Sequence, residues 1–208
     1  MSINLAMDAA AAGRKVTLVD FDIVNPYFRA SDYARMLKEN GVKVISPMYA
    51  GSTVDLPMLS PEIHSVFHDD GVVLIDAGGD DAGAVALGSF AEKILAVDYD
   101  MLYVVNQYRA LSATAEEALA LLHEIERASH IKATAIINNS HLMQDTTPET
   151  IIRSFAFAGA LAAASGLPVR ATVIPKWLAD SVASKVEGGH CTGGAYPADI
   201  YVRPPWAD

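Results

Sequence analysis

The chain has 208 residues, of which 51% are hydrophobic and 19% charged, a balance that excludes an intrinsically disordered polypeptide. A formal net charge of −10 argues against a broad surface for nucleic acid or anionic lipid, and the single cysteine, Cys191, excludes a disulfide framework. No apolar run reaches the roughly 18–20 residues that cross a bilayer, and the first residues lack the basic start of a signal peptide. We therefore expect a cytoplasmic protein.

Short apolar runs alternate with longer helical patterns along the chain. The predicted strands are Lys15–Asp20, Val42–Pro47, Val72–Asp76, Met101–Val105, Ala133–Asn138 and Val169–Pro175. The predicted helices are Ser2–Ala12, Ser31–Asn40, Pro61–His68, Gly83–Ala96, Thr114–Ser129, Pro148–Ser165 and Lys176–Val186. Because the runs are almost wholly apolar, they are typical of parallel strands covered on both faces. The pattern predicts an α/β fold with a doubly wound, mostly parallel sheet and helices on both faces.

The length suits a single domain over residues 1–208, with a core over 1–186 and a C-terminal loop and strap over 187–208. Two helix starts have clear local signals. Thr114 and Glu117 have the spacing of a capping box, and Pro148 follows Thr147 at a predicted first helical position.

Carboxylates and glycines follow two of the predicted strands. Asp20 and Asp22 end the first strand, and Asp76 ends the third and is followed by Gly78 and Gly79. Ligands of open α/β sheets bind at the carboxyl ends of the strands, so these residues predict a site there. A carboxylate at a strand tip can hold Mg²⁺, and a glycine lets the backbone N–H approach a phosphate closely. The alternative interpretation is that these residues only form turns.

Taken together, these segments resemble the MinD/ParA/nitrogenase-iron-protein family of P-loop ATPases, the SIMIBI class with a deviant Walker A motif. GVVLIDAGG resembles a Walker B strand, DAGGD its switch II, and VDFDI the switch I segment. INNS resembles the segment that contacts adenine, and VIPKW the loop that closes over the base. The resemblance implies an ATP-binding, ATP-hydrolysing switch that works as a homodimer with a further protein partner that the sequence leaves unknown.

The resemblance also implies roles for individual residues. Asp22 would be catalytic, orienting the attacking water near Mg²⁺, and Asp76 would be linked to the metal, with Asp20 supporting both. The remaining predicted nucleotide contacts are Gly78, Gly79, Asn138, Asn139 and Pro175.

The chain departs from the family at its start. The family's K-G-G-x-x-K-[ST] loop would lie immediately before Met1, and the run Gly188–Gly194 lacks the required spacing. We therefore expect Met1 to be an internal methionine of a longer protein and this chain alone to be inactive. The family's preceding strand would lie beside Val72–Asp76, so its absence predicts an unpaired slot there.

Two other functions remain open from the sequence: a non-catalytic α/β scaffold (a pseudo-ATPase) and a relative of the cobyrinate-synthase ligases. His64 and His68 have a spacing that can ligate a metal, but no further ligands accompany them, so we expect a solvated helix end. The C-terminal sequence YVRPPWAD is not a membrane-targeting amphipathic helix, and the acidic charge disfavours nucleic acid as a partner.

Overall fold

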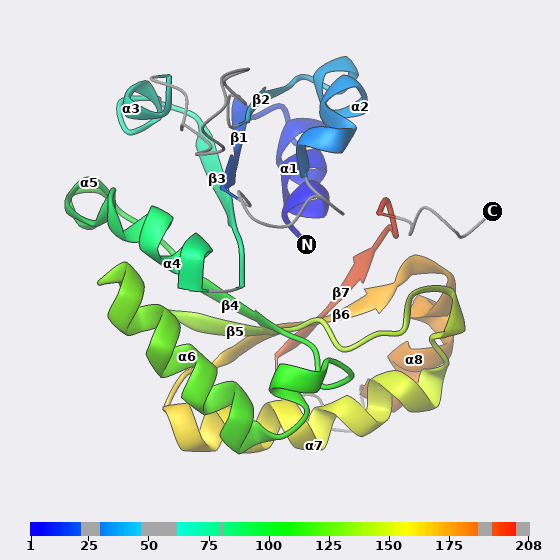
Figure 1. The fold of residues 1–208 in the computed structure, drawn as a ribbon. Coiled ribbons are helices and arrows are strands. Elements are labelled where there is room, and N and C mark those ends of the chain that lie inside the picture. Colours follow the sequence, from blue (N-terminus) through cyan, green and yellow to red (C-terminus); the bar gives the residue numbers. More distant parts are fainter. Residues whose placement is uncertain (22–29, 47–61, 80, 187–192, 203–208) are drawn as a thin grey trace, which may run out of the picture. The chain divides into compact units, whose positions relative to one another are not determined.

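The computed structural model describes residues 1–21, 30–46, 62–79, 81–186 and 193–202. Strands and helices alternate along the described chain, and every strand pair is parallel, which confirms the predicted α/β class (Figure 1). The described residues fall into two compact units. The first unit holds Met1–Asp98 together with Tyr201 and Val202, and the second holds Tyr99–Ile200.

The first unit is built on a three-stranded sheet in the order β2-β1-β3. Its strands are β1 (Val16–Phe21), β2 (Val42–Ile45) and β3 (Val72–Ala77). Its helices are α1 (Ser2–Ala11), α2 (Ala34–Glu39), α3 (Ile63–Val66), α4 (Asp81–Gly88) and α5 (Ala91–Leu95), with a 3-10 turn η1 (Ala30–Tyr33) before α2. All six residues of β1 are buried because this strand is central, with a neighbour on each edge.

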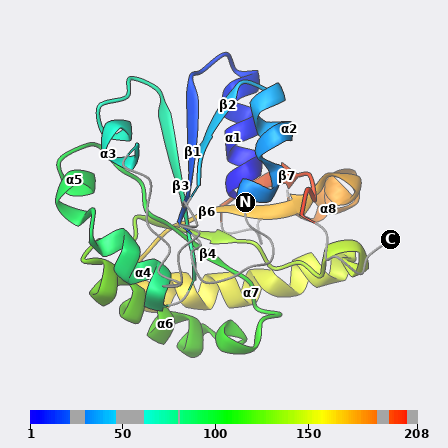
Figure 2. The same cartoon turned by 45° about the horizontal axis from the view of Figure 1, so that its top comes forward.

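The two faces of this sheet have different covers. Val16 and Leu18 of β1 pack with Ile3 and Ala6 of α1 and with Leu37 of α2. Figure 2 shows α1 and α2 on one side of the sheet and α3 and α5 on the other. Neighbouring residues of a strand point to opposite faces. The residues of β1 that alternate with Val16 and Leu18 therefore point to the face covered by α3 and α5.

An aromatic cluster fills that second face. The ring of Phe21 lies 5.5 Å from the ring of Phe90, which also contacts Phe67 and His64. The Lys93 Nζ lies 2.6 Å from Nδ1 of His64 and 5.8 Å from the centre of the Phe67 ring. His64 is therefore packed against an aromatic ring and bonded to a lysine.

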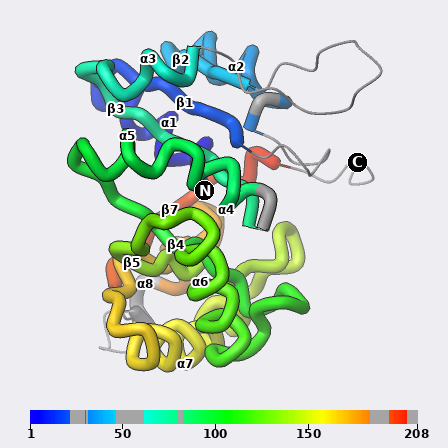
Figure 3. Tube along the Cα trace, turned by 60° about the vertical axis from the view of Figure 1, so that its left-hand side comes forward, coloured from blue at the N-terminus to red at the C-terminus, as the bar shows by residue number. Residues whose placement is uncertain are grey.

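The second unit is built on a four-stranded sheet in the order β4-β5-β6-β7. Its strands are β4 (Leu102–Val105), β5 (Ala135–Asn138), β6 (Val169–Pro175) and β7 (Gly194–Ala198). Its helices are α6 (Ala115–Ser129), α7 (Pro148–Ser165) and α8 (Ala179–Val186), with 3-10 turns η2 (Ala110–Ser112), η3 (Met143–Asp145) and η4 (Lys176–Leu178). Tyr103, Leu122, Ile136 and Leu161 share one buried cluster between the strands and the helix pair α6 and α7, which run beside each other in Figure 3.

The ends of α6 and α7 follow their local signals. Thr114 accepts from the N–H of Glu117 while Glu117 accepts from the N–H of Thr114, so the predicted capping box is confirmed. Thr147 caps α7, Pro148 begins it, and Gly166 ends it in a left-handed conformation at φ 73°.

Two details of the sheet prediction differ from the structure. The described strands form two sheets rather than one, since β3 and β4 each have a single strand neighbour. β7 lies where the sequence predicts only a loop and strap; its Gly-Ala-Tyr-Pro-Ala sequence has weak strand propensity, and the strand forms through its pairing with β6. Pro197 is tolerated because β7 is an edge strand.

The predicted helix over Gly83–Ala96 is also wrong in detail, because it is divided into α4 and α5 around Ser89 and Phe90. None of the helices within the described ranges combines the length and the apolar sequence that a membrane-crossing segment needs.

Candidate functional site

The carboxyl ends of β1 and β3 bring two predicted site residues together. Asp20 and Asp76 are direct partners in the parallel register of the two strands. Side chains at paired positions project to the same face, which here is the face that carries Val16 and Leu18 and packs on α1. Asp20 is completely buried and Asp76 is partly buried. The register therefore places these two carboxylates beside each other at the strand ends.

The first residues of α1 contact Asp76. The Ser2 hydroxyl donates a 2.6 Å hydrogen bond to Oδ1 of Asp76 across 74 residues of sequence. The amino group of Met1 is buried, which lowers its pKa, while the negative charge of Asp76 acts in the opposite direction. A divalent cation at Asp76 would therefore share this carboxylate with Ser2 or displace its hydroxyl.

The loop after β3 holds the two predicted phosphate-contacting glycines. A Cβ atom on Gly83, in the first turns of α4, would lie 2.5 Å from the carbonyl oxygen of Gly78, so the loop folds tightly against this helix. Gly79 is exposed, and a Cβ placed on it would meet no atom of the described residues within 4 Å. The backbone at Gly79 is therefore open to an approaching group.

Asp22, the predicted catalytic carboxylate, lies outside the described residues. Within the described part of the chain, no group of three or more His, Cys, Asp or Glu side chains is arranged to hold a metal ion. The metal site predicted at Asp22 and Asp76 stays a prediction.

Asn138 and Asn139 differ in what their side chains offer. The Asn138 amide is completely buried, donates to Ser154 Oγ at 2.8 Å and Thr172 Oγ1 at 3.4 Å, and accepts from the N–H of Ser140 at 3.3 Å. Asn139 is partly exposed, its N–H donates to the Val105 carbonyl oxygen, and its side chain makes no hydrogen bond within the described residues. Asn139 is thus the one of the pair whose amide can meet a ligand.

Pro175 is the last residue of β6 and is buried. The next residue, Lys176, forms an ion pair with Asp199, and the Trp177 side chain is 54% exposed. The predicted site residues therefore divide between the units: the aspartates and glycines belong to the first, and Asn138, Asn139 and Pro175 to the second. In each unit they lie at the carboxyl ends of parallel strands.

One polar cluster at the edge of the second sheet is absent from the sequence-based prediction. The Asn106 side chain, just after β4, donates from Nδ2 to the carbonyl oxygen of His141 at 3.1 Å and accepts from the N–H of Tyr108 at 2.9 Å. The N–H of Gln107 donates to Ser140 Oγ at 3.0 Å. The polar residue directly after the apolar β4 run is the only sequence signal for this cluster.

Comparison of the chain with protein-family models gives no match, and comparison with curated proteins gives no relative.

Proposed function

We propose that this chain belongs to an ATP-binding and ATP-hydrolysing switch of the MinD/ParA type, in which its residues act together with a glycine-rich phosphate-binding loop. The observation that carries the proposal is the register pairing of Asp20 with Asp76 at the carboxyl ends of adjacent parallel strands, followed by the open backbone at Gly79. This is the edge of an α/β sheet at which ligands bind.

The roles follow from the position of each group. Asp76 would hold Mg²⁺ with Asp20 behind it, and Asp22 would orient the attacking water. The N–H groups of Gly78 and Gly79 would face the terminal phosphate. Mg²⁺ supplies positive charge that stabilises the transferring phosphoryl group. In the second unit, the Asn139 side chain is the amide that remains available to a ligand, whereas the hydrogen bonds of Asn138 commit it to the core.

The packing of α1 indicates where a strand that leads into it would lie. The helices α1 and α2 pack on the same face of the sheet, and β1 connects through α2 to β2. Crossovers between parallel strands are right-handed in about 98% of cases, so two crossovers over one face progress in the same direction. A strand leading into α1 therefore belongs on the side of β1 opposite to β2, at the edge of β3 that has no strand neighbour among the described residues.

The backbone of β3 is suited to such a neighbour. The N–H of Val72 donates to the Lys15 carbonyl oxygen at 2.8 Å, so alternate residues beginning at Val72 face β1. The backbone groups of Val73 and Ile75 consequently face this edge of β3. A strand that carries the phosphate loop would end beside Asp76.

Titration with Mg²⁺–ATP tests the proposal. This chain and a version preceded by a strand and a glycine-rich lysine loop are compared by calorimetry, with Asp76→Asn and Asp98→Asn as variants of the longer version. We expect binding in the longer version, weakened about tenfold or more by Asp76→Asn, which removes one charge contact to the metal, and unchanged by Asp98→Asn. A longer version that folds but binds no Mg²⁺–ATP refutes the proposal.

A non-catalytic scaffold is the second candidate. It is favoured by the hydrogen bond between Ser2 and Asp76, which already engages the carboxylate that a metal would need. The same titration separates the two candidates, because a scaffold binds Mg²⁺–ATP in neither version.

A further inference from the structure

The loops after β4 and β5 of the second unit are joined through Asn106. Its side chain donates to the His141 carbonyl oxygen at 3.1 Å. Its own carbonyl oxygen accepts from the N–H of Arg109 at 3.1 Å and from the Ser112 hydroxyl at 2.9 Å. Arg109 and His141 are therefore each one hydrogen bond from the same residue, although 32 positions separate them in the sequence.

The His141 ring has a fixed hydrogen-bonding role. The N–H of Met143 donates to Nδ1 of His141 at 3.1 Å, so the neutral ring carries its proton on Nε2. Burial lowers the pKa of His141, and surrounding positive charge, of which the Arg109 guanidinium is the smaller part, lowers it further. The ring is thus neutral at pH 7, and its Nε2–H is a hydrogen-bond donor.

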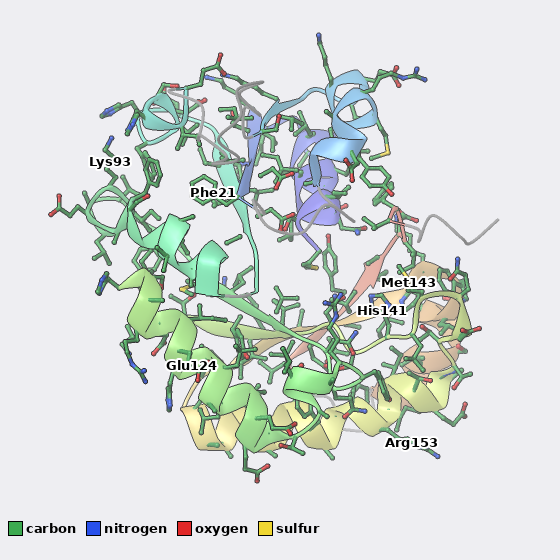
Figure 4. All side chains as sticks on the ribbon, in the orientation of Figure 1. Phe21, Lys93, Glu124, His141, Met143 and Arg153 are labelled. Atoms are coloured by element: carbon green, nitrogen blue, oxygen red, sulfur yellow. The ribbon has the colours of Figure 1, made fainter. Side chains whose placement is uncertain are left out.

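The loop around Met143 holds this ring in place. Met143 has a φ of 53°, a left-handed conformation that costs roughly 1–2 kcal/mol for a residue with a side chain. The Thr146 hydroxyl stabilises it by accepting from the N–H of Leu142 at 2.9 Å and donating to the Met143 carbonyl oxygen at 2.6 Å. Figure 4 shows His141 and Met143 next to each other on this loop.

Neither donor is satisfied within the described part of the chain. The Arg109 side chain is exposed and forms no ion pair with a described carboxylate, and Nε2 of His141 has no described partner. Asp145 lies on the same loop, but its side chain forms no ion pair with either group among these residues. The chain has a net charge of −10, whereas these two neighbouring loops offer a guanidinium and a neutral N–H donor.

We propose that Arg109 and His141 together bind an oxyanion, the carboxylate or phosphate group of a ligand, at the carboxyl edge of the second sheet. The planar guanidinium donates two parallel hydrogen bonds to such a group, and the Nε2–H of His141 adds a third donor. The site uses none of the residues that the proposed nucleotide site requires, so it goes beyond that function.

The test uses this chain, labelled with ¹⁵N, and follows the ring nitrogens of His141 by NMR. Sodium phosphate and sodium succinate are titrated separately at ionic strength held constant with sodium chloride. We expect a saturable shift of Nε2 with one or both anions, and the stronger of the two identifies phosphate or carboxylate as the preferred group. The amide spectrum of each variant reports whether it is folded.

Three variants locate the site. Arg109→Gln removes the positive charge and the two parallel hydrogen-bond donors of the guanidinium, and it is expected to weaken binding about tenfold or more. His141→Gln keeps an acceptor for the N–H of Met143 and a donor toward the ligand, so it retains part of the affinity. Arg153→Gln is the matched control, because Arg153 of α7 is also exposed and forms no ion pair among the described residues; binding should be unchanged.

The proposal is overturned if neither anion gives a saturable shift, or if Arg153→Gln weakens binding as much as Arg109→Gln. The second outcome would show a general response to surface charge. Because the measurement needs no added phosphate loop and no ATP, it can fail while the proposed ATPase activity stands, and the reverse also holds.

Discussion

Replacing Tyr103 by Phe should lower the stability of the protein at neutral pH and raise it in strong alkali. Tyr103 lies on β4, is only 6% exposed, and donates its hydroxyl to the carbonyl oxygen of Ala118 in α6 at 2.8 Å. Burial raises the pKa of Tyr103 to about 12. The hydroxyl can donate this hydrogen bond only while it is protonated.

The magnitude has two opposing parts. At pH 7 the variant loses one buried hydrogen bond, which contributes about 1 kcal/mol to the free energy of unfolding. The unfolded tyrosine has a pKa of about 10, below the folded value, so folding favours the protonated phenol. This contribution is fully present below about pH 10 and is lost at about 1.4 kcal/mol per pH unit as the pH rises toward 12. The total loss of about 2.7 kcal/mol is absent from the variant.

Urea unfolding followed by circular dichroism, from pH 7 to about pH 11.5, measures the difference. We expect Tyr103→Phe to be less stable by about 1 kcal/mol at pH 7, equal to the wild type near pH 11, and more stable above it. Tyr99→Phe is the control, because the Tyr99 hydroxyl makes no hydrogen bond within the described residues. A stability difference that stays constant over the whole range would refute the reasoning.

Three further changes test local features through the thermal midpoint. Met143→Asn should raise the midpoint, with a gain of up to about 1 kcal/mol in the free energy of unfolding, because asparagine tolerates the left-handed conformation at φ 53°. A lower midpoint contradicts this. Gly71→Ala should destabilise by about 1–3 kcal/mol, since the new Cβ would lie 2.5 Å from the Lys15 carbonyl oxygen, whereas Gly79→Ala, with open space around it, is the control that should change little. Thr114→Ala should cost about 1 kcal/mol by removing the capping box of α6, and an unchanged midpoint would show that the cap contributes nothing.

The ends of elements were predictable where the signals are local. The structure gives α7 the predicted bounds, Pro148–Ser165, because Thr147, Pro148 and Gly166 act within a few residues of the ends they define. The predicted strand Val169–Pro175 likewise agrees with β6. Its β-branched residues are bounded by Gly166 and Pro168 before it and end at Pro175, which are local signals.

Contacts between distant segments were not predictable in the same way. The strand pairing of Gly194–Ala198 depends on β6, because its own residues have weak strand propensity. The hydrogen bond from Ser2 to Asp76 spans 74 residues, and that from Asn106 to His141 spans 35. No local pattern encodes such distances.

The sequence by itself determined the alternation of helices and strands and the polar residues at the strand ends, because periodicity, caps and turn formers act over a few neighbouring residues. Only the tertiary structure decided which of those polar residues are committed to the core. Asn138 and Asn139 are adjacent and chemically identical, yet the strand directs Asn138 toward Ser154 and leaves the Asn139 side chain partly exposed. That choice depends on the register and the helix packed against the strand, which become fixed only when the chain folds.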